Sequence, residues 1–251
     1  MTILITGASS GLGAAMARTL VKKGNAVIGA ARREEQLDAL HQELEQHLFF
    51  PLIMDVSDKA SVDRSLAILP EQWRTIDTLI NNAGLALGLS SADQADMVDW
   101  EIMVNTNILG LIYLTRQLLP SMVKNRHGQI INIGSTAGNW PYYGANVYGA
   151  SKAFVKQFSR NLRADLAKYR IRVSNIEPGL CGDTEFSKVR FKGDLQKEKQ
   201  PYENIHYLTP QDIADIVLFI YEAPSHVNIN SLEVMPVAQT FAGLITYPQQ
   251  E

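Results

Sequence analysis

Residues 1–13 read M-T-I-L-I-T-G-A-S-S-G-L-G, an apolar run that ends in three glycines, Gly7, Gly11 and Gly13. The run predicts a buried strand over residues 1–6, and the residues that follow predict a helix over about 11–23. Glycines at such a turn let the backbone bend sharply and let the helix N–H groups face a phosphate. The spacing G-x-x-x-G-x-G differs from the familiar G-x-G-x-x-G, but its place after the first strand of a βαβ unit predicts a dinucleotide-binding fold.

Apolar runs and helical patterns alternate along the rest of the chain. The runs predict strands at residues 1–6, 25–31, 49–54, 76–81, 128–134, 170–176 and 232–236. The patterns predict helices at about 11–23, 33–46, 58–68, 95–123, 147–168 and 211–222. This alternation favours parallel βαβ units covered on both faces, so we expect an α/β fold, a doubly wound parallel sheet. No linker divides residues 1–251, which predicts a single domain whose long irregular segment, 178–209, covers the ligand.

The charge balance argues against two classes of partner. With 23 basic and 26 acidic side chains the formal net charge is −3, which favours neither nucleic acid nor an anionic membrane surface. The longest charge-free stretch, residues 127–151, is interrupted by polar residues and proline and predicts no membrane span. The five histidines are scattered, so we expect no metal. Cys181 is the only cysteine and the first residues lack a signal-peptide pattern, so we expect a cytoplasmic protein.

The end of the second predicted strand indicates which dinucleotide binds. An NAD site usually has an Asp or Glu there for the ribose 2′-hydroxyl, but Ala30 and Ala31 are followed by Arg32 and Arg33. Two solvated arginines at a helix start are the alternative. Because cations at a helix N-terminus oppose the helix dipole, an anion beside them is expected, and the 2′-phosphate of NADP suits the arginine fork.

Two further strand ends carry candidate cofactor contacts. Asp55 and Val56 follow the third strand, where they can line the adenine, although a helix-capping role for Asp55 is an equal alternative. The fourth strand ends in N-N-A-G, and Asn82 there is expected to tie adjacent strands beside the cofactor.

Tyr148 and Lys152 carry the chemical hypothesis. Four residues apart on a predicted helix, they lie on one face, and a lysine cation beside a phenol stabilises its phenolate. A Y-x-x-x-K pair also arises by chance, so its context matters. Ser135 leaves the preceding strand, where its hydroxyl can hydrogen-bond a substrate oxygen while the tyrosine exchanges the proton. Asn107 can hold a water against Lys152, although a buried helical asparagine needs partners in any case.

These motifs together resemble those of the short-chain dehydrogenase/reductase family over essentially the whole chain. The residues that carry the resemblance are T-G-A-S-S-G-L-G, N-N-A-G, Asn107, Ser135, Tyr148 with Lys152, and Pro178–Gly179. The resemblance implies a Rossmann-type fold, a nicotinamide cofactor and a catalytic tetrad of Asn107, Ser135, Tyr148 and Lys152. It also implies a homotetramer formed partly through the helices predicted at 95–123 and 147–168, with the charge-free stretch 234–250 suited to a second interface.

A closer resemblance is to the bacterial and yeast NADP-dependent 3-hydroxy acid dehydrogenases. It rests on N-N-A-G-L-A-L-G, I-N-I-G-S-T-A-G-N-W-P-Y, E-P-G-L with T-E-F and V-R-F-K-G-D, and H-V-N-I-N-S-L-E-V-M-P-V. This resemblance implies that Ser135 and Tyr148 contact the substrate. The residues it implies as NADP contacts are Gly7, Ala8, Ser9, Ser10, Gly11, Leu12, Gly13, Arg32, Arg33, Asp55, Val56, Asn82, Tyr148, Lys152, Pro178, Gly179, Leu180, Thr184 and Phe186.

The expected reaction is reversible hydride transfer between NADP and a small 3-hydroxy acid such as serine, L-allo-threonine or 3-hydroxypropionate, or reduction of malonic semialdehyde. Arg190 or Lys192, both in the 178–209 segment, can meet the carboxylate, and Arg190 is the preferred anchor because arginine pairs with carboxylates in a planar, bidentate manner. A solvated charge run is the alternative for both. Two other functions stay open: a family member that reduces a sugar, an acyl-carrier ketone or another carbonyl compound, and a non-catalytic NADP-binding sensor.

Overall fold

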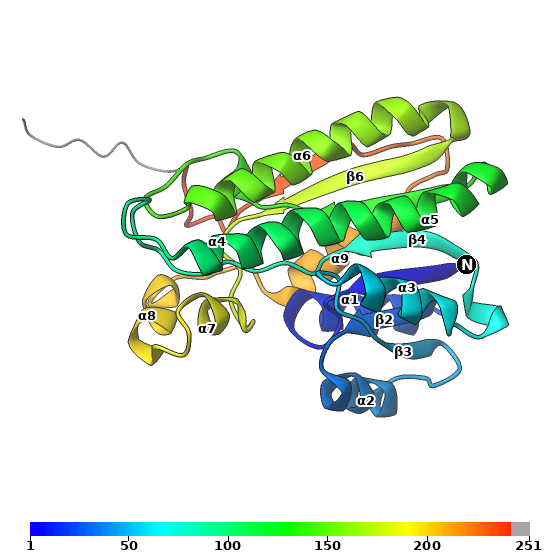
Figure 1. Ribbon diagram of the computed structural model, residues 1–251, viewed down its shortest axis with the longest axis horizontal. Coiled ribbons are helices and arrows are strands. Elements are labelled where there is room, and N and C mark those ends of the chain that lie inside the picture. The colour runs from blue at the N-terminus through cyan, green and yellow to red at the C-terminus, as the bar shows by residue number, and fades with distance from the viewer. Residues whose placement is uncertain (242–251) are drawn as a thin grey trace, which may run out of the picture.

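A sheet of seven parallel strands organises the computed structural model, which describes residues 1–241 (Figure 1). The strands are β1 (Thr2–Thr6), β2 (Ala26–Ala31), β3 (Phe49–Ile53), β4 (Ile76–Asn81), β5 (Gly128–Ile133), β6 (Ile171–Pro178) and β7 (Ser231–Val234). Their order across the sheet is β3-β2-β1-β4-β5-β6-β7, which confirms the predicted α/β, Rossmann-type fold. The strand order reverses between β1 and β4, and sheets of this kind bind ligands outside the carboxyl ends of the strands at that point.

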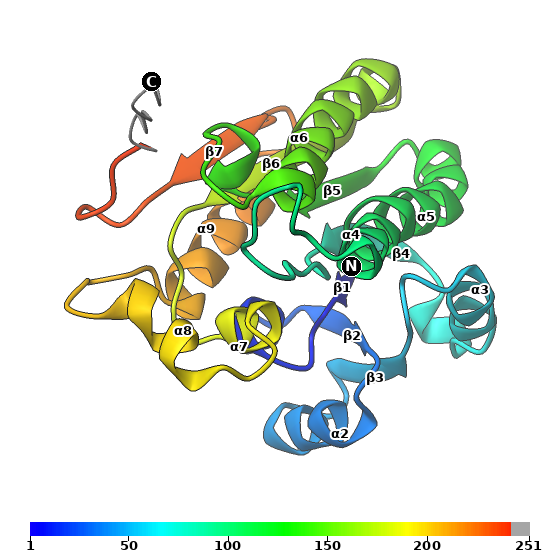
Figure 2. The same cartoon turned by 60° about the vertical axis from the view of Figure 1, so that its left-hand side comes forward.

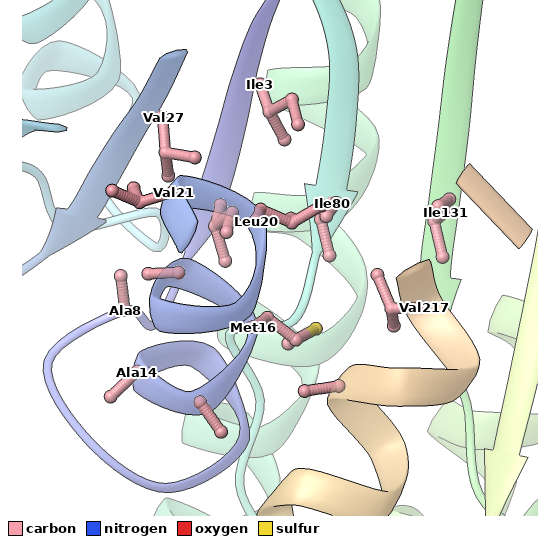
Figure 3. Close-up of a cluster of buried hydrophobic side chains, with 14 of the residues drawn as sticks. Ile3, Ala8, Ala14, Met16, Leu20, Val21, Val27, Ile80, Ile131 and Val217 are labelled. Atoms are coloured by element: carbon pink, nitrogen blue, oxygen red, sulfur yellow. The ribbon is translucent and has the colours of Figure 1, made fainter. Parts of the chain in front are cut away.

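Helices cover both faces of the sheet (Figure 2). One face carries α1 (Gly11–Lys22), α2 (Glu34–Glu43) and α9 (Pro210–Glu222), and the other carries α3 (Lys59–Ala67), α5 (Leu111–Asn125) and α6 (Asn146–Leu166). Because successive strand residues point to opposite faces, Ile3 packs in the first core and Leu4 in the second. Figure 3 shows the first core, where Met16 of α1 and Val217 of α9 lie against the sheet. These two cores fix the strand ends that form the site.

The helix predicted at 95–123 is not one regular helix. It consists of α4 (Met97–Val104), a π-helix (Asn105–Gly110) and α5. A π-helical turn holds more residues than an α-helical turn, so it changes which side chains face the sheet after α4. Asn107 lies inside this turn, which sequence periodicity alone did not reveal.

The segment predicted to be irregular, 178–209, contains regular structure. It includes α7 (Phe186–Arg190), α8 (Leu195–Lys199) and a short 3₁₀ helix (Gln200–Tyr202). An isolated parallel β-bridge between the backbones of Cys181 and Leu208 holds its two ends together. Strand β6 extends to Pro178 because that residue pairs with Val234 of β7. Figures 1 and 2 show α7 and α8 beyond the carboxyl ends of the strands. This segment is therefore a loop with helical turns whose two ends lie together, and it sits at the carboxyl edge of the sheet, where ligands bind.

Two expectations concern interfaces and membranes. Of the charge-free stretch 234–250, residues 242–250 lie outside the described part of the chain. No helix within residues 1–241 has both the length and the apolar character that crossing a bilayer requires.

Candidate active site

The glycine turn between β1 and α1 has the geometry of an anion site. Gly7 and Gly11 have positive φ angles of 69° and 50°, which side chains with a Cβ rarely adopt. A Cβ on Gly13 would lie 2.7 Å from the Gly7 carbonyl carbon, so glycine is needed for α1 to start this close to the sheet. Ser10 at the N-cap makes no side-chain capping bond within the described structure, which leaves first-turn N–H groups facing the pocket.

A pocket of about 930 Å³ extends from this turn along the carboxyl edge of the sheet. It is lined by all the residues predicted from sequence except three. Ala8 is fully buried in the first core, Gly13 packs under the turn, and Asn107 lies buried behind the wall. The predicted residues that line it are Gly7, Ser9, Ser10, Gly11, Leu12, Arg32, Arg33, Asp55, Val56, Asn82, Ser135, Tyr148, Lys152, Pro178, Gly179, Leu180, Thr184, Phe186, Arg190 and Lys192. The pocket is large and elongated enough to fit a dinucleotide.

At the β2 end of the pocket the two arginines differ. Both are exposed, but the Arg33 guanidinium is held in place: it donates to both carboxylate oxygens of Glu185, at 3.1 and 2.7 Å. It also donates to the hydroxyls of Ser9 and Ser10, at 3.1 and 2.8 Å from Nη2. The anion expected beside Arg33 is thus present, but it is a side chain of the 178–209 segment.

The candidate adenine and strand-end contacts have clear local roles. The carboxylate of Asp55 accepts from the amide and hydroxyl of Ser57, at 2.9 and 2.6 Å, and forms a turn. The helix-capping alternative for Asp55 is wrong, because Asp58 caps α3. Asn82 donates to the Thr6 carbonyl at 2.8 Å, so it ties the end of β4 to the end of β1 beside the pocket.

Tyr148 and Lys152 lie together at the inner end of the pocket, near the start of α6. Both are buried, with 7% of their surface exposed, and the Lys152 ammonium is 5.9 Å from the centre of the tyrosine ring. Lys152 Nζ donates to the Ile133 carbonyl at 2.8 Å, which holds it against the end of β5. Ser135 follows β5; its hydroxyl accepts from the Ala137 amide at 3.1 Å and donates to the Pro178 carbonyl at 3.4 Å. The three predicted side chains therefore meet around one space.

Burial controls the ionisation of this pair. It raises the pKa of Tyr148 to about 12, although hydrogen bonding with Ser135 and the charge of Arg190 oppose the rise. Burial also lowers the pKa of Lys152 to about 8. The net shift of the Tyr148 pKa is therefore upward, because burial is the largest effect and outweighs the opposing charge of Arg190. At neutral pH the phenol is protonated and ready to donate.

Asn107 lies behind the lysine in the π-helical turn. Its amide accepts from the Leu85 amide at 2.9 Å and donates to the Leu85 carbonyl at 2.8 Å and to Ser151 at 3.0 Å. A Cβ on Gly84 would lie 3.2 Å from Asn107 Oδ1 and 3.4 Å from Lys152 Nζ. The missing side chain of Gly84 therefore leaves a space that borders both polar groups.

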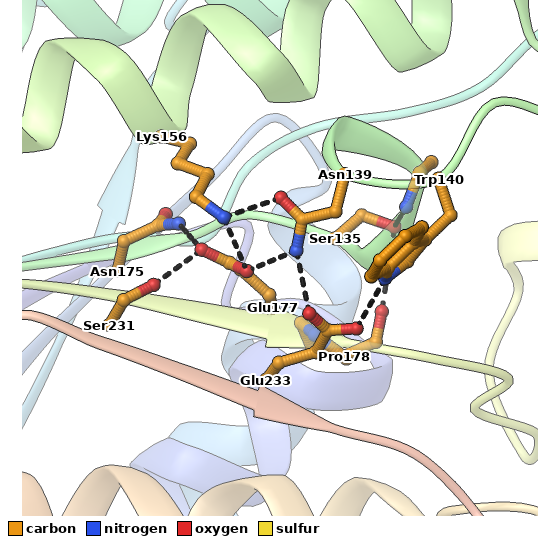
Figure 4. A network of polar contacts seen from close by, with 10 residues as sticks. Ser135, Asn139, Trp140, Lys156, Asn175, Glu177, Pro178, Ser231 and Glu233 are labelled. Atoms are coloured by element: carbon orange, nitrogen blue, oxygen red, sulfur yellow. Dashed lines mark hydrogen bonds and ion pairs between the residues drawn. The ribbon is translucent and has the colours of Figure 1, made fainter. Parts of the chain in front are cut away.

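A polar network behind Ser135 was not predicted from sequence (Figure 4). The buried carboxylate of Glu177 in β6 accepts from Asn139 at 2.5 Å and from Ser231 at 2.5 Å, and lies 3.3 Å from the ammonium of Lys156. Asn139 follows the 3₁₀ turn Thr136–Gly138, whose N-cap is Ser135. The network therefore anchors the turn that positions the serine.

We expect Glu177→Ala to lower the free energy of unfolding by about 1–3 kcal/mol, because it removes the buried carboxylate that accepts from Asn139, Asn175 and Ser231 and takes the ionic partner from the partly exposed Lys156. Burial raises the pKa of Glu177, but its hydrogen bonds and Lys156 outweigh burial, so the pKa is lowered from 4.5. The wild-type protein thus keeps this stabilisation above pH 4.5 and loses it as the pH falls further. Urea unfolding of the wild-type protein and of Glu177→Ala at pH 7 and pH 4 measures the difference in the free energy of unfolding. An equal difference at both pH values would contradict the ionic argument.

The 178–209 segment supplies the outer wall of the inner pocket. Arg190 Nε donates to the Gly88 carbonyl and Nη1 to the Tyr142 hydroxyl, both at 3.1 Å, and its guanidinium carbon is 5.8 Å from the Tyr148 ring centre. Its buried Nη2 has no hydrogen-bond partner in the described structure. The ammonium of Lys192, by contrast, pairs with Asp99 at 2.9 Å. Within residues 1–241 no group of three or more His, Cys, Asp or Glu side chains forms a metal cluster.

Known proteins of similar sequence belong to the family that the sequence resembles. The family model described as short chain dehydrogenase matches residues 1–194. An NADP-dependent 3-hydroxy acid dehydrogenase from Salmonella typhi is 55% identical over 244 residues, which cover 97% of this chain and 98% of that protein. Serine 3-dehydrogenase from Agrobacterium fabrum is 48% identical over 246 residues, 98% of each chain.

Among solved structures, the closed form of a serine dehydrogenase complexed with NADP⁺ is 51% identical, with a TM-score of 0.97 over 99% of this chain and 100% of that one. A further structure, serine dehydrogenase from Escherichia coli, is 46% identical with a TM-score of 0.85, over 96% of this chain and 100% of that one. The resemblance found in the sequence is confirmed: this chain belongs to the short-chain dehydrogenase family.

Proposed function

We propose that this protein is an NADP-dependent oxidoreductase that transfers hydride reversibly between NADP(H) and small 3-hydroxy acids. Its candidate substrates are serine, L-allo-threonine and 3-hydroxypropionate, with malonic semialdehyde in the reductive direction. One observation carries the proposal: a single pocket joins an anion-binding glycine turn at one end to Ser135, Tyr148 and Lys152 at the other. The names of the relatives support both the cofactor and the substrate class.

The pocket fits the cofactor in a defined orientation. The glycine turn would hold the pyrophosphate, Arg32 and Arg33 the 2′-phosphate, and Asp55 and Val56 the adenine edge. The nicotinamide end would then be held by Tyr148, Lys152 and Pro178–Phe186 of the 178–209 segment. When bound, the cofactor supplies the acceptor or donor of the hydride.

The protein's own side chains transfer the proton of the substrate hydroxyl. In oxidation Tyr148 takes the proton of the substrate hydroxyl, and Ser135 hydrogen-bonds the oxygen as it becomes a carbonyl. In reduction the buried, protonated phenol donates that proton back. Lys152, charged below a pH of about 8, stabilises the phenolate form. The space beside Gly84, which borders Asn107 and Lys152, suits the water through which Asn107 would connect the tyrosine to solvent.

Arg190 is the proposed anchor for the substrate carboxylate. Two of its nitrogens are already held by Gly88 and Tyr142, which fix the guanidinium over the Tyr148 ring. The remaining buried nitrogen, Nη2, has no partner among the described residues, and a buried unpaired N–H is costly. A carboxylate bound there would complete its hydrogen bonding and place the neighbouring hydroxyl-bearing carbon near Tyr148.

Arg190→Met should lower kcat/KM for L-serine about 10- to 150-fold, because it removes a charge-assisted hydrogen bond to the carboxylate. The effect should fall mainly on KM, and an uncharged alcohol that the wild-type enzyme oxidises should lose much less. Lys192→Met is the matched control, since that ammonium is paired with Asp99. An unchanged KM for L-serine in Arg190→Met would rule out the anchor.

A substrate panel tests the function as a whole. Following NADPH absorbance, we expect turnover of L-serine, L-allo-threonine, 3-hydroxypropionate and malonic semialdehyde with NADP(H), and little with NAD(H). A preference for a sugar or an acyl-carrier ketone would show that small 3-hydroxy acids are not the substrate class. A folded, NADP-binding protein that turns over no carbonyl compound would indicate a sensor. The single-domain organisation, homotetramer and cytoplasmic location stay predictions, and light scattering of the purified protein tests the tetramer.

A further inference from the structure

The anion site at the β2 end of the pocket is filled by a side chain of the protein itself. Arg33 and the hydroxyls of Ser9 and Ser10 form the site, and the carboxylate of Glu185 lies in it. Glu185 comes from the 178–209 segment, 152 residues along the chain from Arg33, so the contact joins two distant parts of the fold.

The contact is specific in its geometry. Nη1 and Nη2 of Arg33 each donate to a different oxygen of Glu185, which is the two-bond pairing that arginine makes with carboxylates and phosphates. Hydrogen bonds from Arg33 and from Ser10 lower the pKa of Glu185 to about 2, so it is an anion at every pH at which the enzyme would be assayed. Lys188, on the same segment, adds to this effect.

A 2′-phosphate on the cofactor would need the same nitrogens. Of the five N–H groups of Arg33, Glu185 takes one on Nη1 and one on Nη2, and Ser9 and Ser10 accept from Nε and Nη2. A single N–H on Nη1 is left, so a phosphate could pair with two N–H groups only by displacing Glu185 or the serine hydroxyls. A phosphate beside the carboxylate would also place two anions in contact. NAD, which has a hydroxyl in place of the phosphate, makes no such demand.

We propose that Glu185 is a cofactor-specificity residue: its carboxylate occupies the subsite of the 2′-phosphate and competes with NADP, but not with NAD, for Arg33. NADP therefore binds at the cost of the Arg33–Glu185 pair. Further along, near the middle of the segment, Lys192 pairs with Asp99. This inference rests on the proposed use of NADP.

The test compares the wild-type protein with Glu185→Gln, which removes the charge and keeps the shape. Titration calorimetry with adenosine 2′,5′-bisphosphate, adenosine 5′-diphosphate, NADP⁺ and NAD⁺ gives four dissociation constants for each protein. In Glu185→Gln we expect the two 2′-phosphorylated compounds to bind about three- to tenfold more tightly and the other two to change less than about twofold. Glu203→Gln, an exposed residue of the same segment, controls for net charge.

A double variant identifies the site of the effect. Arg33→Met should abolish the gain produced by Glu185→Gln, because the competition is for that guanidinium. Weaker binding of NADP⁺ in Glu185→Gln, or an equal change for NADP⁺ and NAD⁺, would overturn the inference and indicate a strap that holds either cofactor. If neither protein prefers the 2′-phosphorylated ligands, the proposed NADP dependence fails; if the wild-type protein prefers them and Glu185→Gln gains nothing, only the role of Glu185 fails.

Discussion

Tyr148→Phe should lower kcat/KM about 10³-fold in both directions of the reaction, because it removes the only hydroxyl placed to exchange the substrate proton in the proposed mechanism. The ring of Tyr148 packs on Phe186 at 5.7 Å between centres, and phenylalanine keeps that contact. We therefore expect the dissociation constant for NADP⁺ and the unfolding midpoint to change little. Steady-state kinetics and calorimetry on the same preparation measure all three.

Tyr143→Phe is the matched control for this variant. Tyr143 lies five residues before Tyr148 and is 55% exposed, so the loss of its hydroxyl should leave kcat/KM within about twofold of the wild-type value. If Tyr148→Phe kept more than about a tenth of the wild-type activity, a different group would have to transfer the proton.

Lys152→Met should have an effect of similar size, about 10²- to 10⁴-fold on kcat/KM. Without the ammonium, the buried phenolate has one fewer cation to stabilise it. The Tyr148 pKa then rises further, and the rise of oxidation rate with pH should move to higher pH. Lys168→Met, an exposed lysine at the end of the same helical region, is the control and should not shift the profile.

The stability of Lys152→Met separates catalysis from structure. The folded protein lowers the Lys152 pKa from 10.5 to about 8, so burial of the charged form costs free energy below pH 8. Its replacement by an apolar side chain relieves that cost and removes one hydrogen bond to Ile133. We expect the free energy of unfolding to stay the same or rise while activity is lost, and a large loss of stability would instead indicate a structural lysine.

Much of the fold and of the site could be predicted from sequence because the signals are local. The strand–glycine–helix pattern at residues 1–13 and the four-residue spacing of Tyr148 and Lys152 depend only on neighbouring residues. Chemical type was informative too: Arg32 and Arg33 in the place of an acidic residue predicted an anion at that point, and the structure has one beside Arg33.

The features that sequence did not reveal depend on long-range contacts. Glu185 is opposite Arg33, and Asn139 opposite Glu177, only because the strand order brings their segments together. The ionisation of Tyr148 also depends on burial by distant residues, which reversed the direction expected for its pKa. The sequence does carry signals near these contacts: Glu185 stands within T-E-F, and Asn139 and Glu177 stand within motifs that the family shares.

The central claim, direct transfer of hydride from the hydroxyl-bearing carbon to NADP⁺, is tested most directly with L-serine deuterated at that carbon. Mass spectrometry of the reduced cofactor after turnover shows whether the deuterium has moved. The proposed reaction predicts that the NADPH formed carries one deuterium, with the proton of the hydroxyl passing separately to Tyr148. NADPH formed without deuterium, or no NADPH from any 3-hydroxy acid, would contradict it.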